Sequence, residues 1–289
     1  MPFRSGRLLP LLVGSAMLPS WVSAQAIRPR PITLDPRAPA AAARLQPLTV
    51  FDSTFRRPRR IWVYTPKAYS ATGSPPYPLL VAFDGAEYRD TMPLPLILDT
   101  LAAGHRAPAF VAVLIDNGGG AERIADLGNA AKMVQFLSGQ LLPYVRAQWH
   151  VTTDPHRVIV TGSSAGGLAA AFVAFERPEM FGNVLAQSGA FWRGAEASND
   201  PPYEWLTAQV REAPVRDLRF FMDVGEFENH PTLGGSGPNF LEANRRFRDA
   251  LLHRGYKVNY AEVPGGQHGP PYWSERLPVG LVALTTDWH

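Results

Sequence analysis

The chain has 289 residues, of which 46% are hydrophobic and 18% are charged, so it can bury a core of domain size and is not a disordered polypeptide. Its 28 basic residues barely exceed its 25 acidic ones, which argues against nucleic acid as a partner. Because the sequence has no cysteine, disulfides, a thiol nucleophile and a zinc–thiolate site are excluded.

The first 24 residues have the pattern of a secretory signal peptide. Two arginines precede the apolar run 8–18, and the small residues of 22–24 follow it. This pattern predicts cleavage between Ala24 and Gln25, and therefore a periplasmic or secreted protein. The apolar run is broken by Pro10 and is too short to span a bilayer, so no stable membrane insertion is expected.

The remaining chain divides into a short lead-in and one large domain. Residues 25–44 are rich in proline and alanine and lack apolar periodicity, which is typical of a flexible segment. Over 45–289, the predicted single domain, apolar strand patterns alternate with helical ones. Strands are expected at 48–52, 60–65, 78–83, 109–115, 157–161, 183–188, 218–224 and 257–263, and helices at 94–103, 129–149, 166–175, 203–211, 240–253 and 273–288.

This alternation predicts a fold of the α/β class. Short continuous apolar runs such as 78–83 and 109–115 suit strands that are buried on both faces. Connections of helical length indicate a doubly wound, mostly parallel sheet, which begins with an antiparallel hairpin that turns at Arg57-Pro58. The arginines around that turn are expected to be exposed; they are Arg56, Arg57, Arg59 and Arg60.

The sequence Gly162-Ser163-Ser164-Ala165-Gly166 fits the Gly-x-Ser-x-Gly nucleophile elbow of α/β-hydrolases. It directly follows an expected strand and opens an expected helix, which is the setting that the motif requires. Ser164 would lie at the helix N-terminus, where the dipole favours developing negative charge. The alternative is an ordinary glycine-rich turn with a capping serine. We expect Ser164 to be the nucleophile and Ser163 to be a bystander.

A serine hydroxyl needs a histidine to take its proton, and the histidine needs a carboxylate to orient it. His268 lies in a loop just past the last expected strand, and His230 is its rival. Glu228 and Glu226 follow the expected strand 218–224 and both remain candidates, with Glu228 preferred because Gly225 gives the loop room to turn. Asp223 is expected inside the strand.

The expected strand 78–83 leads into Asp84-Gly85-Ala86, a turn at the same sheet edge. An α/β-hydrolase holds the tetrahedral oxyanion with one backbone N–H after the nucleophile and another after such an early strand. Those groups would belong to Ala165 and Ala86, with Gly85 permitting the turn. A plain tight turn is the alternative.

From these motifs the chain resembles the esterase family that includes enterochelin (enterobactin) esterases, feruloyl esterases and mycolyltransferases, and it is most similar to the enterochelin esterase catalytic domain. The resemblance covers about residues 48–289. The segments that carry it are Arg59-Arg-Ile-Trp-Val-Tyr-Thr-Pro66, Tyr77-Pro-Leu-Leu-Val-Ala-Phe-Asp-Gly85, Val113-Leu-Ile-Asp116, Gly162-Ser-Ser-Ala-Gly-Gly167, Gln187-Ser-Gly-Ala-Phe-Trp192 and Gly265-Gly-Gln-His-Gly269.

The resemblance implies an α/β-hydrolase fold and a serine esterase (EC 3.1.1.-). The sequence has no evident metal site or phosphate-binding loop, so no cofactor and no metal are expected. The resemblance agrees with Glu228 as the acid and with a tryptophan, Trp273, five positions after His268. The sequence departs from the family at Gln267, where glycine is frequent. Cytoplasmic enterochelin esterases also carry an N-terminal substrate-gripping domain, where this sequence has about twenty Pro- and Ala-rich residues, so the chain looks more like the shorter exported esterases.

The sequence defines the residues of the substrate pocket less closely than it defines the catalytic candidates. The short connection between 188 and 218 predicts a shallow, open cleft that suits a bulky ester. Trp192 and Trp273, with Trp205, Tyr88 and Tyr272, either line the cleft or pack in the core. Arg123 either meets an anionic substrate group or pairs with Asp126.

We therefore expect a serine esterase that acts on a small-molecule ester, with siderophore hydrolysis as one candidate activity. A feruloyl- or acetyl-type carbohydrate esterase and an acyltransferase are alternatives, because the same triad supports them. A binding protein on an inactive hydrolase scaffold is a third hypothesis, against which the complete order Ser164, Glu228, His268 argues. Nothing in the sequence specifies an oligomeric state.

Overall fold

The computed structural model describes residues 44–73, 75–195, 198–232, 235 and 237–288. The predicted signal peptide and all but the last residue of the Pro/Ala-rich lead-in lie outside the described residues. In the described part of the chain, no helix is both long enough and apolar enough to cross a membrane.

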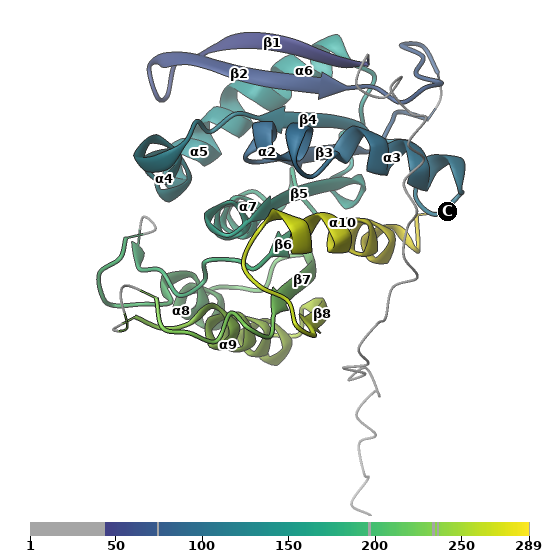
Figure 1. Cartoon of the computed structure of the whole chain (residues 1–289). Coiled ribbons are helices and arrows are strands. Elements are labelled where there is room, and N and C mark those ends of the chain that lie inside the picture. The colour runs from purple at the N-terminus through teal and green to yellow at the C-terminus, as the bar shows by residue number, and fades with distance from the viewer. Residues whose placement is uncertain (1–43, 74, 196–197, 233–234, 236, 289) are drawn as a thin grey trace, which may run out of the picture.

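Eight strands of the described residues form one sheet in the order β1-β2-β4-β3-β5-β6-β7-β8 (Figure 1). Strands β3 to β8 are parallel to one another, whereas β2 pairs antiparallel with both β1 and β4. This arrangement confirms the predicted fold class. The strands are β1 Leu45–Asp52, β2 Arg57–Tyr64, β3 Leu79–Ala82, β4 Val111–Ile115, β5 Val158–Ser163, β6 Asn183–Gln187, β7 Arg219–Gly225 and β8 Lys257–Val263.

Helices cover both faces of the sheet because the central strands are apolar on both sides. Alternate residues along β3 enter different clusters, with Val81 in one and Leu80 in the other. The Leu80 face is covered by α2 Gly85–Asp90, α3 Leu94–Ala103 and α10 Pro270–Thr285. The Val81 face is covered by α4 Gly120–Gly128, α5 Ala130–Phe136, α6 Leu142–Gln148, α7 Ala165–Glu176, α8 Trp205–Glu212 and α9 Phe240–His253.

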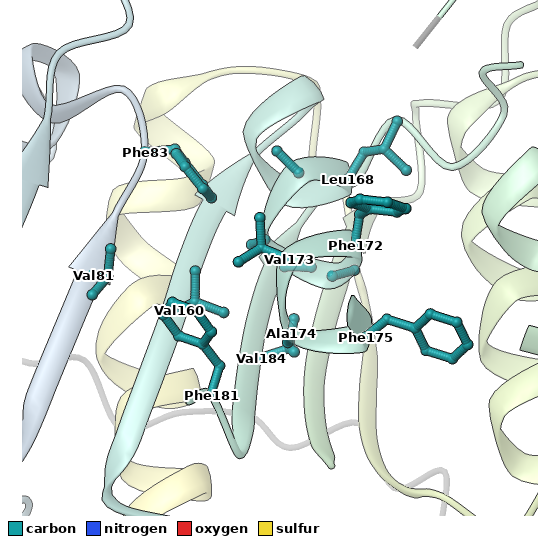
Figure 2. Packing of buried hydrophobic residues seen from close by; sticks show 14 of the residues in the cluster. Val81, Phe83, Val160, Leu168, Phe172, Val173, Ala174, Phe175, Phe181 and Val184 are labelled. Atoms are coloured by element: carbon teal, nitrogen blue, oxygen red, sulfur yellow. The ribbon is translucent and has the colours of Figure 1, made fainter. Parts of the chain in front are cut away.

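Helix α7 is the centre of the larger cluster. It packs along β5 and β6 through side chains that are almost completely buried, among them Val173 and Ala174 (Figure 2). Phe83, just after β3, and Val160 of β5 belong to the same cluster. Burying this helix on the sheet fixes its N-terminus, and therefore Ser164, at the carboxyl edge of β5.

The hairpin turns earlier than expected. Its turn spans residues 53–56, because the Asp52 carboxylate accepts the backbone N–H groups of Thr54 and Phe55, each at 3.0 Å. The expectation of exposed arginines is wrong for Arg59, whose side chain is 1% exposed and donates to Asp52 at 2.8 Å. Arg56 and Arg60 are exposed, as expected, and Arg57 is partly exposed.

The helix expected over 129–149 is interrupted. Asn129 caps α5 as its side chain accepts the Lys132 N–H, but residues Leu137–Leu141 form a π-helical turn before α6. In a regular α-helix the ring of Pro143 would clash with the carbonyl group of Gly139. The π turn removes that clash. A 3-10 turn, Pro155–Arg157, then leads into β5.

Candidate active site

Ser164 lies at the sharp turn between β5 and α7. Its backbone has φ 57° and ψ −121°, a conformation that a residue with a side chain adopts only under strain. Its N–H donates to the Gln187 carbonyl at 2.9 Å, which helps to hold the turn. The neighbouring Ser163 faces elsewhere, because its hydroxyl is 3.4 Å from the buried Tyr88 hydroxyl.

Glycine is required at the elbow by close backbone approach. A Cβ on Gly162 would lie 2.4 Å from the carbonyl group of Gly166, and a Cβ on Gly167 would lie 3.1 Å from the Gly162 oxygen. Strand β5 and helix α7 therefore approach too closely for a side chain at Gly162, and they leave little room for one at Gly167.

His268 connects the serine to a carboxylate. Its Nε2 lies 3.1 Å from Ser164 Oγ and its Nδ1 lies 2.6 Å from Glu228 Oε2. An ionised carboxylate only accepts hydrogen bonds, so Nδ1 carries the proton and Nε2 is left to accept the serine proton. The His268 side chain is 35% exposed and the Glu228 side chain only 1%, so the imidazole faces solvent and its partner does not.

Glu228 is fixed by two further donors. Its Oε1 accepts the Ser188 hydroxyl at 2.5 Å and the Gly225 N–H at 2.8 Å. The Trp273 indole N–H in turn donates to Ser188 Oγ at 2.9 Å. These bonds hold the carboxylate against His268.

The other acidic candidate takes a different position. Glu226 is exposed and its Oε2 accepts the Gly265 N–H at 3.2 Å, which ties the loop after β7 to the loop after β8. His230, the rival base, lies in the loop after β7 and lines a cavity beside His268. The structure therefore brings together Ser164, His268 and Glu228, and leaves Glu226 as a loop contact.

Asp223 lies inside β7, as expected, with its side chain 2% exposed. Burial raises the pKa of its carboxyl group to about 7, although the Arg276 guanidinium and the Gln187 amide oppose that shift. The raised pKa means that folding favours the neutral acid. Its favourable contribution is complete below the unfolded value of about 4 and is lost as the pH rises through about 7.

Asp223→Asn is therefore expected to change stability in a pH-dependent way. The melting temperature of the variant minus that of the wild type should increase between pH 5 and pH 8, because only the wild type ionises a buried group over this interval. Thermal unfolding of both proteins at several pH values measures this difference. A difference that stays constant with pH would contradict the assignment. The folded variant should keep most of its rate.

The two predicted oxyanion donors lie at helix starts on the same sheet edge. Ala86 is the second residue of α2 and Ala165 the first of α7, positions whose N–H groups have no acceptor within their helix. Asp84, rather than Gly85, takes the left-handed conformation, with φ 54°. Gly85 is needed for a different reason, because a Cβ there would lie 2.6 Å from the Leu114 backbone.

Most of the predicted pocket residues are buried or bonded to other residues of the protein. Trp192 and Trp273 are 4% and 6% exposed, and Trp273 packs edge-on to His268 with ring centroids 4.9 Å apart. Arg123 pairs with Asp84 rather than with Asp126. A cavity of about 600 Å³ lies beside the imidazole, and its lining comprises Phe227, Glu228, His230, Thr232, Phe240, Gln267 and His268.

Sequence reasoning missed three contributors to this site. Ser188, in the left-handed conformation after β6, supports Glu228, and Phe240 packs against His268 with ring centroids 4.3 Å apart. Asp84, which the sequence indicates only as part of a turn, accepts two bonds from Arg123. The segment from Gln187 to Trp192 carries part of the family resemblance, but no spacing rule places a serine beside a carboxylate forty positions away.

The fold is that of the α/β-hydrolases, and Ser164, His268 and Glu228 lie together at the carboxyl edge of its sheet. A model of the esterase family described as "Putative esterase" matches residues 53–284, and the chain belongs to this family. An iron(III) enterobactin esterase from Dickeya dadantii is 34% identical over 258 residues, which cover 86% of this chain and 56% of that protein. The chain thus spans about half the length of the curated relatives it matches.

Solved structures agree with this assignment. The enterobactin esterase from Shigella flexneri, crystallised in the presence of enterobactin, matches with a TM-score of 0.74 at 25% identity, covering 85% of this chain and 59% of that one. A ferulic acid esterase matches with a TM-score of 0.67 at 20% identity, covering 84% of this chain and 98% of that one, and shows the shared fold alone.

Proposed function

We propose that the chain is an exported serine esterase that hydrolyses carboxylic esters through an acyl-enzyme on Ser164, with enterobactin-type siderophore esters as its substrate class. The observation that carries the proposal is the position of His268, 3.1 Å from Ser164 and 2.6 Å from Glu228. The unbroken hydrogen-bonded series of Ser164, His268 and Glu228 favours catalysis over a binding role on the same scaffold.

The contacts support a two-step reaction. His268 Nε2 takes the Ser164 proton as Oγ attacks the ester carbonyl, and the negative oxygen is held by the N–H groups of Ala86 and Ala165. His268 then donates the proton to the departing alcohol. A water molecule, activated by the same imidazole, attacks the acyl-enzyme and releases the carboxylic acid, which restores the free serine.

The substrate class rests on two observations. The Dickeya dadantii relative, named an iron(III) enterobactin esterase, matches across 86% of this chain. The cavity beside His268 is lined in part by Phe227 and Phe240, which suit an aromatic group on the alcohol that receives the proton from His268. Phe227 is 55% exposed, so the cavity opens to solvent and admits a bulky ester.

A hydrolysis screen tests this proposal. Purified protein is supplied with enterobactin, feruloylated sugars and short acyl esters, with and without candidate acceptor alcohols, and products are identified by mass spectrometry. Release of dihydroxybenzoyl-serine units from enterobactin with the highest kcat/KM is the expected result. Preference for feruloylated sugars, or new esters formed on an acceptor, would instead support a carbohydrate esterase or an acyltransferase. No turnover of any ester would contradict the enzyme proposal.

Export gives a separate prediction. Protein recovered from the periplasm or medium of an expressing bacterium should begin at Gln25, because a signal peptidase cuts after a small residue such as Ala24. N-terminal sequencing reads this residue directly. Active protein that retains Met1 and stays in the cytoplasm would contradict the export proposal and leave the esterase proposal intact.

A further inference from the structure

Arg123 of α4 contacts both segments that carry the proposed oxyanion donors. Its Nε and Nη2 donate to the two carboxylate oxygens of Asp84, each at 2.7 Å, and Nη2 also donates to the Ser163 carbonyl at 3.3 Å. Asp84 lies two residues before Ala86, and Ser163 lies two residues before Ala165. One guanidinium therefore links the turn after β3 to the elbow after β5.

Asp84 is held at each of its polar groups. Its N–H donates to Asn117 Oδ1 at 2.9 Å, and its carbonyl accepts the Glu87 N–H at 2.9 Å. A Cβ on Gly166 would lie only 2.9 Å from Asp84 Oδ2, so the carboxylate also packs against the start of α7. These contacts stabilise the left-handed backbone at Asp84, which carries strain in a residue with a side chain.

Helix α4 is itself anchored, which fixes the origin of the Arg123 side chain. Asp126, three residues further along the helix, accepts Arg57 Nη2 and Arg59 Nη1, each at 2.5 Å. Arg59 also donates to Asp52 in β1. The hairpin of β1 and β2 is therefore bonded to helix α4 through Asp126. A guanidinium that is hydrogen-bonded to two loops can position them only if the helix that carries it is itself held in place.

The charge of Arg123 matters as well as its shape. The Asp84 side chain is 5% exposed and lies two residues before Ala86, one of the proposed oxyanion donors. Its burial raises its pKa, whereas the Arg123 guanidinium opposes that shift and keeps the ionised form paired. An unpaired carboxylate at this place would repel the oxyanion, so the guanidinium balances a charge that would otherwise oppose catalysis.

We infer that Arg123 is a positioning residue, which holds the Ala86 and Ala165 N–H groups at a fixed separation through Asp84 and the Ser163 carbonyl. The inference rests on the proposed esterase function. Arg123 acts here through other residues and not on an anionic group of the substrate. Its loss should therefore weaken binding of the tetrahedral transition state and leave ground-state binding nearly unchanged.

The test compares R123M, R123K and D84N with wild type and S164A. The control is R177M, which removes an arginine whose side chain is 37% exposed and pairs with Glu179 on the surface. Each protein is assayed with neutral p-nitrophenyl acetate and with anionic mono-p-nitrophenyl succinate. The inhibition constant of a trifluoromethyl ketone, which forms an oxyanion on the serine, is also measured, and rates are expressed per folded, titrated site.

For R123M we expect kcat to fall about 10²-fold on both esters, with KM changed less than about threefold and the ketone bound more weakly by a similar factor. R123K keeps the positive charge but not the two-pronged guanidinium, so it should recover part of kcat. D84N removes the carboxylate that Arg123 binds, so it should also lower kcat. R177M should match wild type. The rescue and the loss of ketone affinity distinguish positioning from a role in folding alone.

Two results would overturn the inference while the esterase proposal stands. A rise in KM confined to the succinate ester would show that Arg123 binds substrate. Normal kcat per titrated site in R123M, with only a lower melting temperature, would show a role limited to stability. Wild-type protein without Ser164-dependent hydrolysis would instead overturn the proposed function, and the inference with it.

Discussion

Ser164→Ala is expected to lower esterase kcat by at least about 10³-fold, because the alanine removes the atom that forms the acyl-enzyme. The hydroxyl is the group that His268 Nε2 faces at 3.1 Å, and the strained backbone holds it there. Removing one oxygen at a partly exposed position leaves the packing of α7 unchanged, so the variant should fold normally. Steady-state kinetics on p-nitrophenyl acetate, with circular dichroism as a check of folding, measures the effect.

Ser163→Ala is the matched control for that experiment. Its hydroxyl is buried and lies 3.4 Å from the Tyr88 hydroxyl. Losing this weak bond should change kcat far less than the loss of Ser164. Full activity in Ser164→Ala, or a larger loss in Ser163→Ala, would refute the assignment of the nucleophile.

Much of the fold could be predicted because the signals are local. Buried parallel strands are short apolar runs, and the bounds expected for α3, α9 and β8 are those observed. The short helices α2 and α4 were missed because glycines lie at their starts and no side chain caps either N-terminus. The π turn before Pro143 depends on how one helix relieves a clash, which apolar periodicity does not encode.

The site shows the same division between local and distant information. The elbow motif is contiguous, so Ser164 could be proposed from five residues, and a loop position after the last strand singled out His268. The pairing of Arg123 with Asp84 spans 39 positions. The bond from Trp273 to Ser188 spans 85 positions. Contacts of this kind depend on which loops the fold places side by side. Sequence proximity suggested Asp126 as a partner for Arg123, whereas the partner in the structure is Asp84.

Glu228→Gln is expected to lower kcat by about 10²- to 10⁴-fold while changing KM little. The carboxylate receives the Nδ1 proton of His268 at 2.6 Å, and its charge stabilises the imidazolium that forms as the serine loses its proton. An amide could present its NH₂ group to Nδ1 and favour the wrong tautomer, in which Nε2 carries the proton. Because the lost interaction strengthens only as charge develops, the effect falls on kcat.

Glu226→Gln tests the assignment beside it, because both residues follow β7 and differ by two positions. The amide oxygen of the glutamine can still accept the Gly265 N–H that Glu226 Oε2 binds at 3.2 Å, so the loop should keep its shape and the rate should be nearly normal. Kinetics of the two variants on one ester, at equal folded concentration, gives the comparison. A crippled Glu226→Gln with a near-normal Glu228→Gln would reverse the acid assignment, while the pair of Ser164 and His268 would still stand.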